Sequence, residues 1–310
     1  MASSLPLVLL IDLDGTVVGD IDHFFTEFDL HDRFPTNGKS GKSSKSGKGG
    51  KGGKGGKGGK GGKGRAPTLS ASVRKQMIER LSMGILRPYF RSFVKRCPCE
   101  MFVYTAGTSD WAAFIVPCIE ASTGVKFNRP IFSRTHCAPV GGSSGSSAAF
   151  TKSIATVRPL IYRALKSRYS LTSPTQLQDR VMLVDNTPNV LIEHRCMLLC
   201  PTYSFSYAYD FLSLFSPSHL YENYRGIAET MALNTGVDFY SFMAAYYTLL
   251  SQDARRTAIR ENTLQLKDRF WKTFESLLNK AVARSYTFTP ELVKALNNRI
   301  ASTSSSSTRM

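Results

Sequence analysis

Two aspartates separated by one residue, Asp12 and Asp14, are the most chemically informative pair in the sequence. They follow the apolar run 7–11, which is typical of a short buried β-strand. Side chains two positions apart on a strand point to the same side, so both carboxylates are expected to converge where the strand ends. Gly15 then permits a sharp turn, and open parallel sheets bind ligands at this end of their strands. The alternative explanation is an ordinary Asp-Gly turn.

Two carboxylates held close together repel each other unless a positive group lies between them. A divalent cation that prefers oxygen ligands, Mg²⁺ above all, meets this requirement. One aspartate can then act as a nucleophile, and the other can donate and accept a proton. The pair therefore predicts metal-dependent chemistry at the end of the first strand.

Two further apolar runs also end in polar residues. Residues 101–104 precede Thr105, whose hydroxyl is suited to contact phosphate oxygens. Residues 181–184 precede Asp185, which repeats the arrangement of a strand that ends in an acid. A fourth short strand is expected over 197–200. These strands predict an α/β sheet with its polar residues gathered at one edge.

The segments between the strands carry helix signals. A helix is expected over 70–83, and another over 158–169. Ser109 is predicted to cap a helix over 110–121. Pro117 lies inside that span, where it is expected to kink the helix or end it early.

Two segments at 131–134 and 149–152 flank the Gly-Ser loop 141–147, and they predict a β-hairpin with a long tip. Beyond Tyr209 the sequence is helical in character. The apolar residues of 266–278 follow helical spacing, so this stripe is expected to bury against the rest of the molecule.

The positive charge of the chain is unevenly distributed. The net charge is +17 over 310 residues, but nine lysines, one arginine and no acid lie within 39–65, so the remainder carries +7. The Lys-Gly-Gly repeats of this segment cannot hold a helix or strand, and their like charges repel. The segment is predicted to be disordered, either as a solvated linker or as a tether for RNA, DNA or an acidic protein.

The six cysteines form no Cys-x-x-Cys pair, which favours a reducing compartment. A zinc site from Cys97, Cys99 and a distant histidine is the alternative, although this spacing fits no usual zinc motif. The apolar start lacks a basic region and is interrupted by Asp12, so no signal peptide is expected. No apolar run is long enough to span a bilayer. The sequence predicts a soluble intracellular protein of the nucleus or cytoplasm.

Taken in order, these segments resemble the motifs of the haloacid dehalogenase (HAD) superfamily of phosphotransferases. The likeness is closest to its Fcp1/small CTD phosphatase (NIF-type) branch and covers roughly residues 7–36 and 85–215. The matching segments are Asp12-Leu13-Asp14-Gly15-Thr16, Leu86-Arg87-Pro88, Tyr104-Thr105-Ala106-Gly107, Phe132-Ser133-Arg134 with Cys137, Lys152, and Val184-Asp185-Asn186-Thr187-Pro188.

The resemblance implies a role for each acid of the first motif. Asp12 would attack phosphorus and carry the aspartyl-phosphate. Asp14 would protonate the leaving oxygen and then activate water. The Asp12 carboxylate, the Asp14 backbone carbonyl and Asn186 would hold Mg²⁺.

The resemblance also implies a phosphate-binding set. Thr105, Ala106 and Lys152 would contact phosphate oxygens, and Lys152 would neutralise charge that develops on them in the transition state. Asp185 would orient Lys152 and a metal-bound water.

The sequence departs from the family pattern in four places. The insert 38–65 occupies the region of the usual β-hairpin flap, and Gly107 replaces the usual serine. The segment 133–151 has become rich in Gly and Ser, and the helical end 221–298 lies outside the likeness. These departures bear on substrate choice more than on chemistry.

The predicted fold is α/β: a Rossmann-like HAD parallel sheet with helices on both faces, a small β insertion and a helical C-terminal extension. The predicted core covers 1–37 and 66–220, with the disordered Lys/Gly/Ser-rich insert 38–65 between them. The helical extension covers 221–300, and a disordered Ser-rich tail covers 301–310.

The predicted function is a Mg²⁺-dependent phosphatase for phosphoserine and phosphothreonine in proteins, similar to RNA polymerase II CTD phosphatases. The expected partners are a phosphoprotein substrate and, through the insert, a polyanion; no membrane contact is expected. The alternatives are a nucleic-acid end phosphatase and a non-catalytic peptide-binding module. The intact set of Asp12, Asp14, Lys152 and Asp185 argues against pure binding, which does not require all four.

Overall fold

The structure is a computed structural model that describes residues 5–21, 71–139, 150–205, 264–283 and 287–307. The predictions for the basic insert 38–65 lie outside these residues.

Four parallel strands form the central sheet, in the order β2-β1-β5-β6. The strands are β1 (Val8–Ile11), β2 (Glu100–Val103), β5 (Val181–Asp185) and β6 (Met197–Leu199). The register pairs Ile11 with Val103 on one side and with Val184 on the other. The residues that follow these three positions therefore emerge at the same edge of the sheet.

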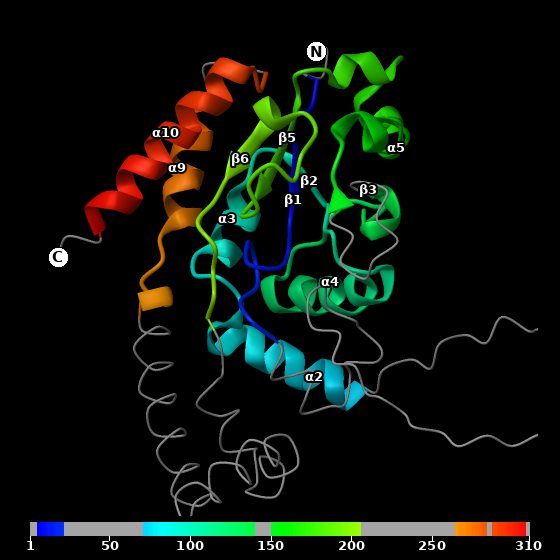
Figure 1. The fold of residues 1–310 in the computed structure, drawn as a ribbon. Helices are drawn as coiled ribbons and strands as arrows, with labels where there is room; N and C mark the ends of the chain where they lie inside the picture. Colours follow the sequence, from blue (N-terminus) through cyan, green and yellow to red (C-terminus); the bar gives the residue numbers. More distant parts are fainter. Residues whose placement is uncertain (1–4, 22–70, 140–149, 206–263, 284–286, 308–310) are drawn as a thin grey trace, which may run out of the picture.

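Helices cover both faces of this sheet, which is why the interior positions of its strands are apolar on both sides rather than alternating. Leu9 and Ile11 of β1 face one core, and Val8 and Leu10 face the other. The second core is covered by α5 (Ile154–Tyr169), which lies opposite α9 and α10 in Figure 1. The predicted α/β fold with a parallel sheet between helical layers is confirmed.

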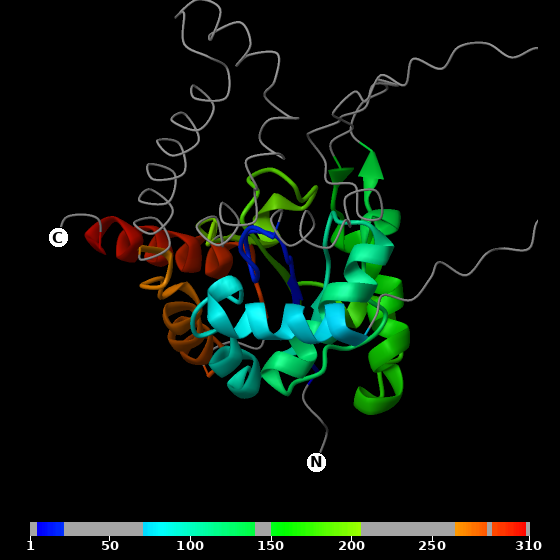
Figure 2. The same cartoon turned by 90° about the horizontal axis from the view of Figure 1, so that it is seen from below.

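Of the helices in the described ranges, five lie on the first face. They are α2 (Ala71–Arg80), α3 (Phe90–Arg96), α4 (Ser109–Thr123), α9 (Phe270–Val282) and α10 (Pro290–Ser307). The view from below in Figure 2 shows α2 running across this side of the molecule, and α2 packs against α4.

The C-terminal helices pack firmly on the core. Trp271 of α9 is fully buried, and its ring centroid lies 4.8 Å from that of Phe90 and 4.7 Å from that of Phe93. Such aromatic pairs contribute about 0.5–1.5 kcal/mol each beyond their buried area. The predicted apolar stripe is therefore buried from Phe270 onward, whereas Leu266 remains 52% exposed.

Helix α10 covers the edge strand β6. The Asn297 side chain accepts a hydrogen bond from Leu199 N at 2.9 Å and donates one to Met197 O at 2.9 Å. The helix extends to Ser307, whereas the Ser-rich composition predicted disorder from residue 301. Extending an existing helix adds one hydrogen bond per residue without a new nucleation cost, so weak helix formers can be included.

Two helix boundaries differ from the predictions. Thr108, not Ser109, caps α4, and its hydroxyl accepts from Trp111 N at 3.2 Å. The helix continues through Pro117 to Thr123, so the expected early end is wrong. Helix α5 begins at Ile154 rather than at 158 because partners from elsewhere satisfy its first N–H groups.

The predicted hairpin exists with a different first strand. Strand β3 (Ala138–Pro139) pairs antiparallel with β4 (Phe150–Thr151), so the prediction of a first strand at 131–134 is wrong. Phe132 instead bridges to Tyr104 in parallel beside the main sheet. Its ring is fully buried against Phe102 and Tyr104, so packing fixes this segment to the sheet rather than to the hairpin.

Candidate active site

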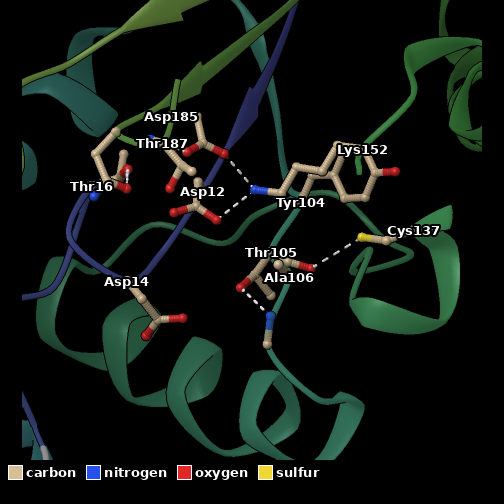
Figure 3. Close-up of polar contacts among 12 residues, drawn as sticks. Asp12, Asp14, Thr16, Tyr104, Thr105, Ala106, Cys137, Lys152, Asp185 and Thr187 are labelled. Carbon is tan, nitrogen blue, oxygen red and sulfur yellow. Dashed lines mark hydrogen bonds and ion pairs between the residues drawn. The ribbon is translucent and has the colours of Figure 1, made fainter. Parts of the chain in front are cut away.

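Three strands deliver polar residues to one edge of the sheet. Asp12 directly follows β1, Thr105 lies two residues beyond β2, and Asp185 ends β5. Lys152 reaches the same point from the segment between β4 and α5. The structure thus brings together residues that are up to 173 positions apart, as Figure 3 shows.

Lys152 is the centre of this arrangement. Its side chain is 1% exposed, and its Nζ lies 2.6 Å from Asp12 Oδ1 and 2.6 Å from Asp185 Oδ2. Burial opposes the charge, but the two carboxylates outweigh it and raise the pKa of Lys152. The lysine therefore remains an ammonium ion at every physiological pH.

The backbone around Lys152 is fixed by a loop that follows β5. Lys152 N donates to Val190 O at 2.7 Å, and Ile192 N donates to Lys152 O at 2.9 Å. Glu193 then accepts from Ile154 N at 2.9 Å and Ala155 N at 3.0 Å at the start of α5. Hydrogen bonds therefore fix the backbone at Lys152 and just after it, so the ammonium group is preorganised.

Asp12 has more negative than positive charge around it. Burial and the nearby Asp185 raise the pKa of Asp12 to about 7, against the opposing effect of Lys152. One ammonium does not balance the two carboxylates that it contacts. The cluster therefore carries excess negative charge, which an additional cation would neutralise.

Asp14 does not point into this cluster. Strand β1 ends at Ile11, before either aspartate, so strand alternation is not what positions the pair, although Asp14 lies close enough to raise the pKa of Asp12. In Figure 3 the Asp14 carboxylate lies apart from Lys152, and it accepts from Trp111 Nε1 at 3.2 Å. Asp14 keeps access to solvent. Desolvation by the surrounding protein nevertheless raises the pKa of Asp14, although the indole hydrogen bond lowers it.

The predicted phosphate contacts form a compact turn after β2. The Thr105 hydroxyl accepts from Gly107 N at 2.9 Å, and Ala106 O accepts from Arg134 Nε at 2.9 Å. A Cβ atom at Gly107 would lie 2.6 Å from Cδ1 of Trp111. The missing serine of this motif therefore leaves room for the indole that contacts Asp14.

Asn186 lies against the turn of the first motif. Its Oδ1 accepts from Thr16 Oγ1 at 3.1 Å, and its Nδ2 donates to Thr202 Oγ1 at 3.3 Å. A Cβ atom at Gly15, where φ is +72°, would lie 2.5 Å from Asn186 Nδ2. Glycine is thus required here both for its backbone angle and for the close approach of the amide.

The residue types of the first and last motifs fit a hard cation. Within the described residues no three His, Cys, Asp or Glu side chains are grouped to hold a metal, which gives the zinc alternative at Cys97 and Cys99 no support there. The Asp12 carboxylate, the Asn186 amide oxygen and a backbone carbonyl are oxygen donors of the kind that Mg²⁺ takes. The unbalanced negative charge at Asp12 agrees with this choice.

Three residues with structural roles at this site were not assigned by the sequence. Trp111 contacts Asp14, Glu193 fixes the segment after Lys152, and Arg87 contacts the turn at Thr16. Arg87 belongs to the Leu-Arg-Pro motif, which signalled its importance but not its partners. Trp111 and Glu193 carried no signal in spacing or composition.

None of the described helices has the length and apolar character that crossing a membrane requires.

Comparison with known proteins adds two findings. Fission yeast Fcp1, an RNA polymerase II CTD phosphatase solved with beryllium fluoride, shares 14% identity over 89% of this chain, with a TM-score of 0.37. A second solved Fcp1 chain shares 17% identity over 91%, with a TM-score of 0.39. This chain spans 62% and 63% of those chains, less than two thirds of their length. No curated protein sequence matches it.

A protein-family model matches the middle part of the chain. Residues 68–214 match the model of the NLI interacting factor-like phosphatases. This segment contains Thr105, Lys152 and Asp185, whereas Asp12 and Asp14 lie before it. The expected resemblance to the NIF-type phosphatases is thereby confirmed for this segment.

Proposed function

We propose that the protein is a Mg²⁺-dependent phosphatase that removes phosphate from phosphoserine and phosphothreonine in proteins through an aspartyl-phosphate on Asp12. The observation that carries this proposal is the buried Lys152 ammonium held between Asp12 and Asp185. A preorganised cation beside a carboxylate at a strand end is suited to a phosphoryl group that arrives there.

In the first step an oxygen of Asp12 attacks phosphorus, and the bond between phosphorus and the substrate oxygen breaks. Asp14 gives its proton to that leaving oxygen. The raised pKa of Asp14 supports this role because a proton donor must be protonated when the substrate binds. Lys152 and the turn at Thr105 compensate the charge that develops on the phosphoryl oxygens.

In the second step Asp14 accepts a proton from a water molecule that attacks phosphorus. The bond to Asp12 breaks, and inorganic phosphate leaves. Asp12, Asn186 and the Asp14 carbonyl would hold Mg²⁺, which supplies positive charge that screens the nucleophile from the incoming phosphate.

The test uses the full-length protein with an aryl phosphate, phosphoserine and phosphothreonine peptides, and 5′- or 3′-phosphorylated oligonucleotides. We expect hydrolysis of the aryl phosphate and the peptides in Mg²⁺ and none in excess chelator. Asp12→Asn should lower the rate at least about 1,000-fold because it removes the nucleophile. Asp110→Asn, which changes an exposed aspartate on α4, is the matched control and should stay active.

Each result bears on a separate part of the proposal. Undiminished turnover by Asp12→Asn would exclude this residue as the nucleophile. Activity that persists in chelator would exclude the metal. Preferential hydrolysis of the oligonucleotides would assign a nucleic-acid end phosphatase instead, and binding of phosphopeptides without turnover would assign a recognition module.

A further inference from the structure

A second buried cation, Arg87, lies between the catalytic core and the C-terminal extension. Its side chain is fully buried just before α3. Its Nε lies 3.0 Å from Asp268 Oδ1, and its Nη2 lies 2.9 Å from Asp268 Oδ2. This two-point contact fixes the plane of the guanidinium group as well as its position.

The same guanidinium also contacts the core. Its Nη1 donates to the Thr16 backbone carbonyl at 3.3 Å and to Cys200 Sγ at 3.6 Å. Its Cζ lies 4.7 Å from the ring centroid of Phe270 and 5.5 Å from that of Tyr203. One side chain therefore connects the turn after β1, the segment after β6 and the start of α9.

The turn that Arg87 contacts is the one that presents the site residues. The backbone of Arg87 donates to Val17 O at 2.9 Å, so both its main chain and its side chain hold this turn. The Thr16 hydroxyl in turn donates to Asn186 Oδ1 at 3.1 Å. A continuous set of hydrogen bonds thus runs from Asp268 through Arg87 and Thr16 to Asn186.

Asp268 is also fixed from its own side. Its Oδ1 accepts from Phe270 N at 2.9 Å, at the first residue of α9. The carboxylate that orients Arg87 is therefore attached to the same helix whose aromatic residues pack on α3. Packing of α9 on the core therefore also places this carboxylate.

We propose that the C-terminal extension is a positioning element of the active-site turn, acting through Asp268 on Arg87 and through Arg87 on Thr16. Neither Asp268 nor Arg87 touches the reacting atoms; both are positioning residues. The consequence for catalysis rests on the proposed function, but the ordering of residues 13–18 by the extension does not.

The experiment measures hydrogen–deuterium exchange of the full-length protein by mass spectrometry, with peptides that cover residues 13–18. The amides of Thr16, Val17 and Val18 all donate to Leu13 O, so their exchange reports whether the turn is closed. Asp268→Asn removes the charge with little change in shape. We expect exchange in 13–18 to accelerate about tenfold, while β5 stays protected.

Two further variants separate positioning from general stability. Glu275→Gln breaks the ion pair of Arg96 Nε with Glu275 Oε1 (2.9 Å), which also joins α3 to α9 but does not reach the turn. It should leave exchange in 13–18 unchanged. Asp268→Glu keeps the carboxylate and should restore part of the protection.

Unchanged exchange of 13–18 in Asp268→Asn would overturn the proposal. Equal acceleration of every core peptide, β5 included, would also overturn it, because the ion pair would then be only a stabilising contact. Aryl phosphate kinetics form a separate arm, in which Asp268→Asn should raise the Mg²⁺ concentration needed for half-maximal rate. A wild-type protein without phosphatase activity would refute the proposed function, and the exchange data would still decide the role of the extension.

Discussion

Lys152 and Arg87 are both buried cations that contact the first motif, but they are held in different ways. Lys152 is a point charge shared between two carboxylates, Asp12 and Asp185. The planar guanidinium group of Arg87 pairs with the single carboxylate of Asp268 and lies over aromatic rings. An ammonium with three rotatable donors can change its partners, whereas a bidentate guanidinium keeps its geometry.

The charge balance also differs between the Lys152 site and the Arg87 site. The Arg87 pair is neutral, and its fixed contacts suit a permanent connection between segments. The Lys152 cluster carries more carboxylate than ammonium, and burial with Asp185 raises the pKa of Asp12 to about 7. The contrast agrees with the two proposed roles, chemistry for Lys152 and positioning for Arg87. The following predictions test this distinction, from the largest expected effect to the smallest.

Replacing Lys152 by methionine should lower kcat for the aryl phosphate by about 100- to 1,000-fold, because the transition state loses a preorganised positive charge. Initial rates in Mg²⁺ measure this, with circular dichroism to show that the variant folds. Lys166→Met, at an exposed lysine on α5, is the matched control. Near wild-type turnover by Lys152→Met would remove the lysine from the catalytic machinery.

Replacing Arg87 by methionine should lower the free energy of unfolding by about 3 kcal/mol, because it breaks a buried ion pair and leaves the Asp268 carboxylate without its partner. Urea denaturation measures the change, with Arg91→Met as the control at an exposed arginine of α3. A loss no larger than that of the control would place Arg87 among ordinary surface ion pairs.

Stability in excess chelator should fall as the pH rises from about 4 to 7. The folded pKa of Asp12 lies at about 7, above its usual value of 3.8, so the folded state binds this proton more tightly than the unfolded state. The contribution is complete below pH 3.8 and is lost as the pH rises through 7, at no more than about 1.4 kcal/mol per pH unit.

Urea denaturation at several pH values measures this slope for the wild type and for Asp12→Asn. The variant has no carboxyl group at this position and should lack the contribution. Parallel profiles for the two proteins would show that Asp12 does not hold a raised pKa.

Replacing Trp111 by phenylalanine should reduce kcat/KM by about 3- to 10-fold, the usual effect of losing one hydrogen bond. The loss should be larger for an alkyl phosphate than for an aryl phosphate, because an alkoxide leaving group depends more on the proton of Asp14. Equal losses for both substrates would indicate that the indole shapes the site rather than orienting the acid.

Deleting residues 39–64 should leave aryl phosphate turnover unchanged, because this small substrate gains nothing from distant lysines. Binding to RNA, DNA or an acidic phosphopeptide should weaken at low salt, and the difference should shrink as salt shortens the Debye length to about 8 Å and below. Equal polyanion affinity with and without the segment at low salt would contradict its role as a tether.

Much of the fold was predictable because the strands are local apolar runs that end in polar residues. Strands β1 and β5 lie where their sequences indicate, and their parallel register brings Asp12 and Asp185 to one edge. The placement of Lys152 depends on a hairpin whose first strand differs from the predicted one, since Phe132 pairs with Tyr104 instead. Burial of the Phe132 ring fixes its segment to the main sheet instead of the hairpin. Local residue spacing does not show with which strand such a segment pairs.

Other contacts of the site lie beyond any local pattern. Arg87 and Asp268 are 181 residues apart, and only the docking of α9 brings them together. Trp111 reaches Asp14 from the first turn of α4, where Gly107 leaves space for the indole. These contacts depend on helix position and rotation, which follow from packing of the complete core.

The side chain of Asn297 has a consequence for self-association. Its amide takes the two hydrogen bonds that an additional strand would form with Met197 and Leu199 of β6. An open strand edge is a template on which another chain can add and begin a polymer. Packing of α10 thus blocks the addition of another chain at the β6 edge. A chain cut before Pro290 would expose this edge and should aggregate.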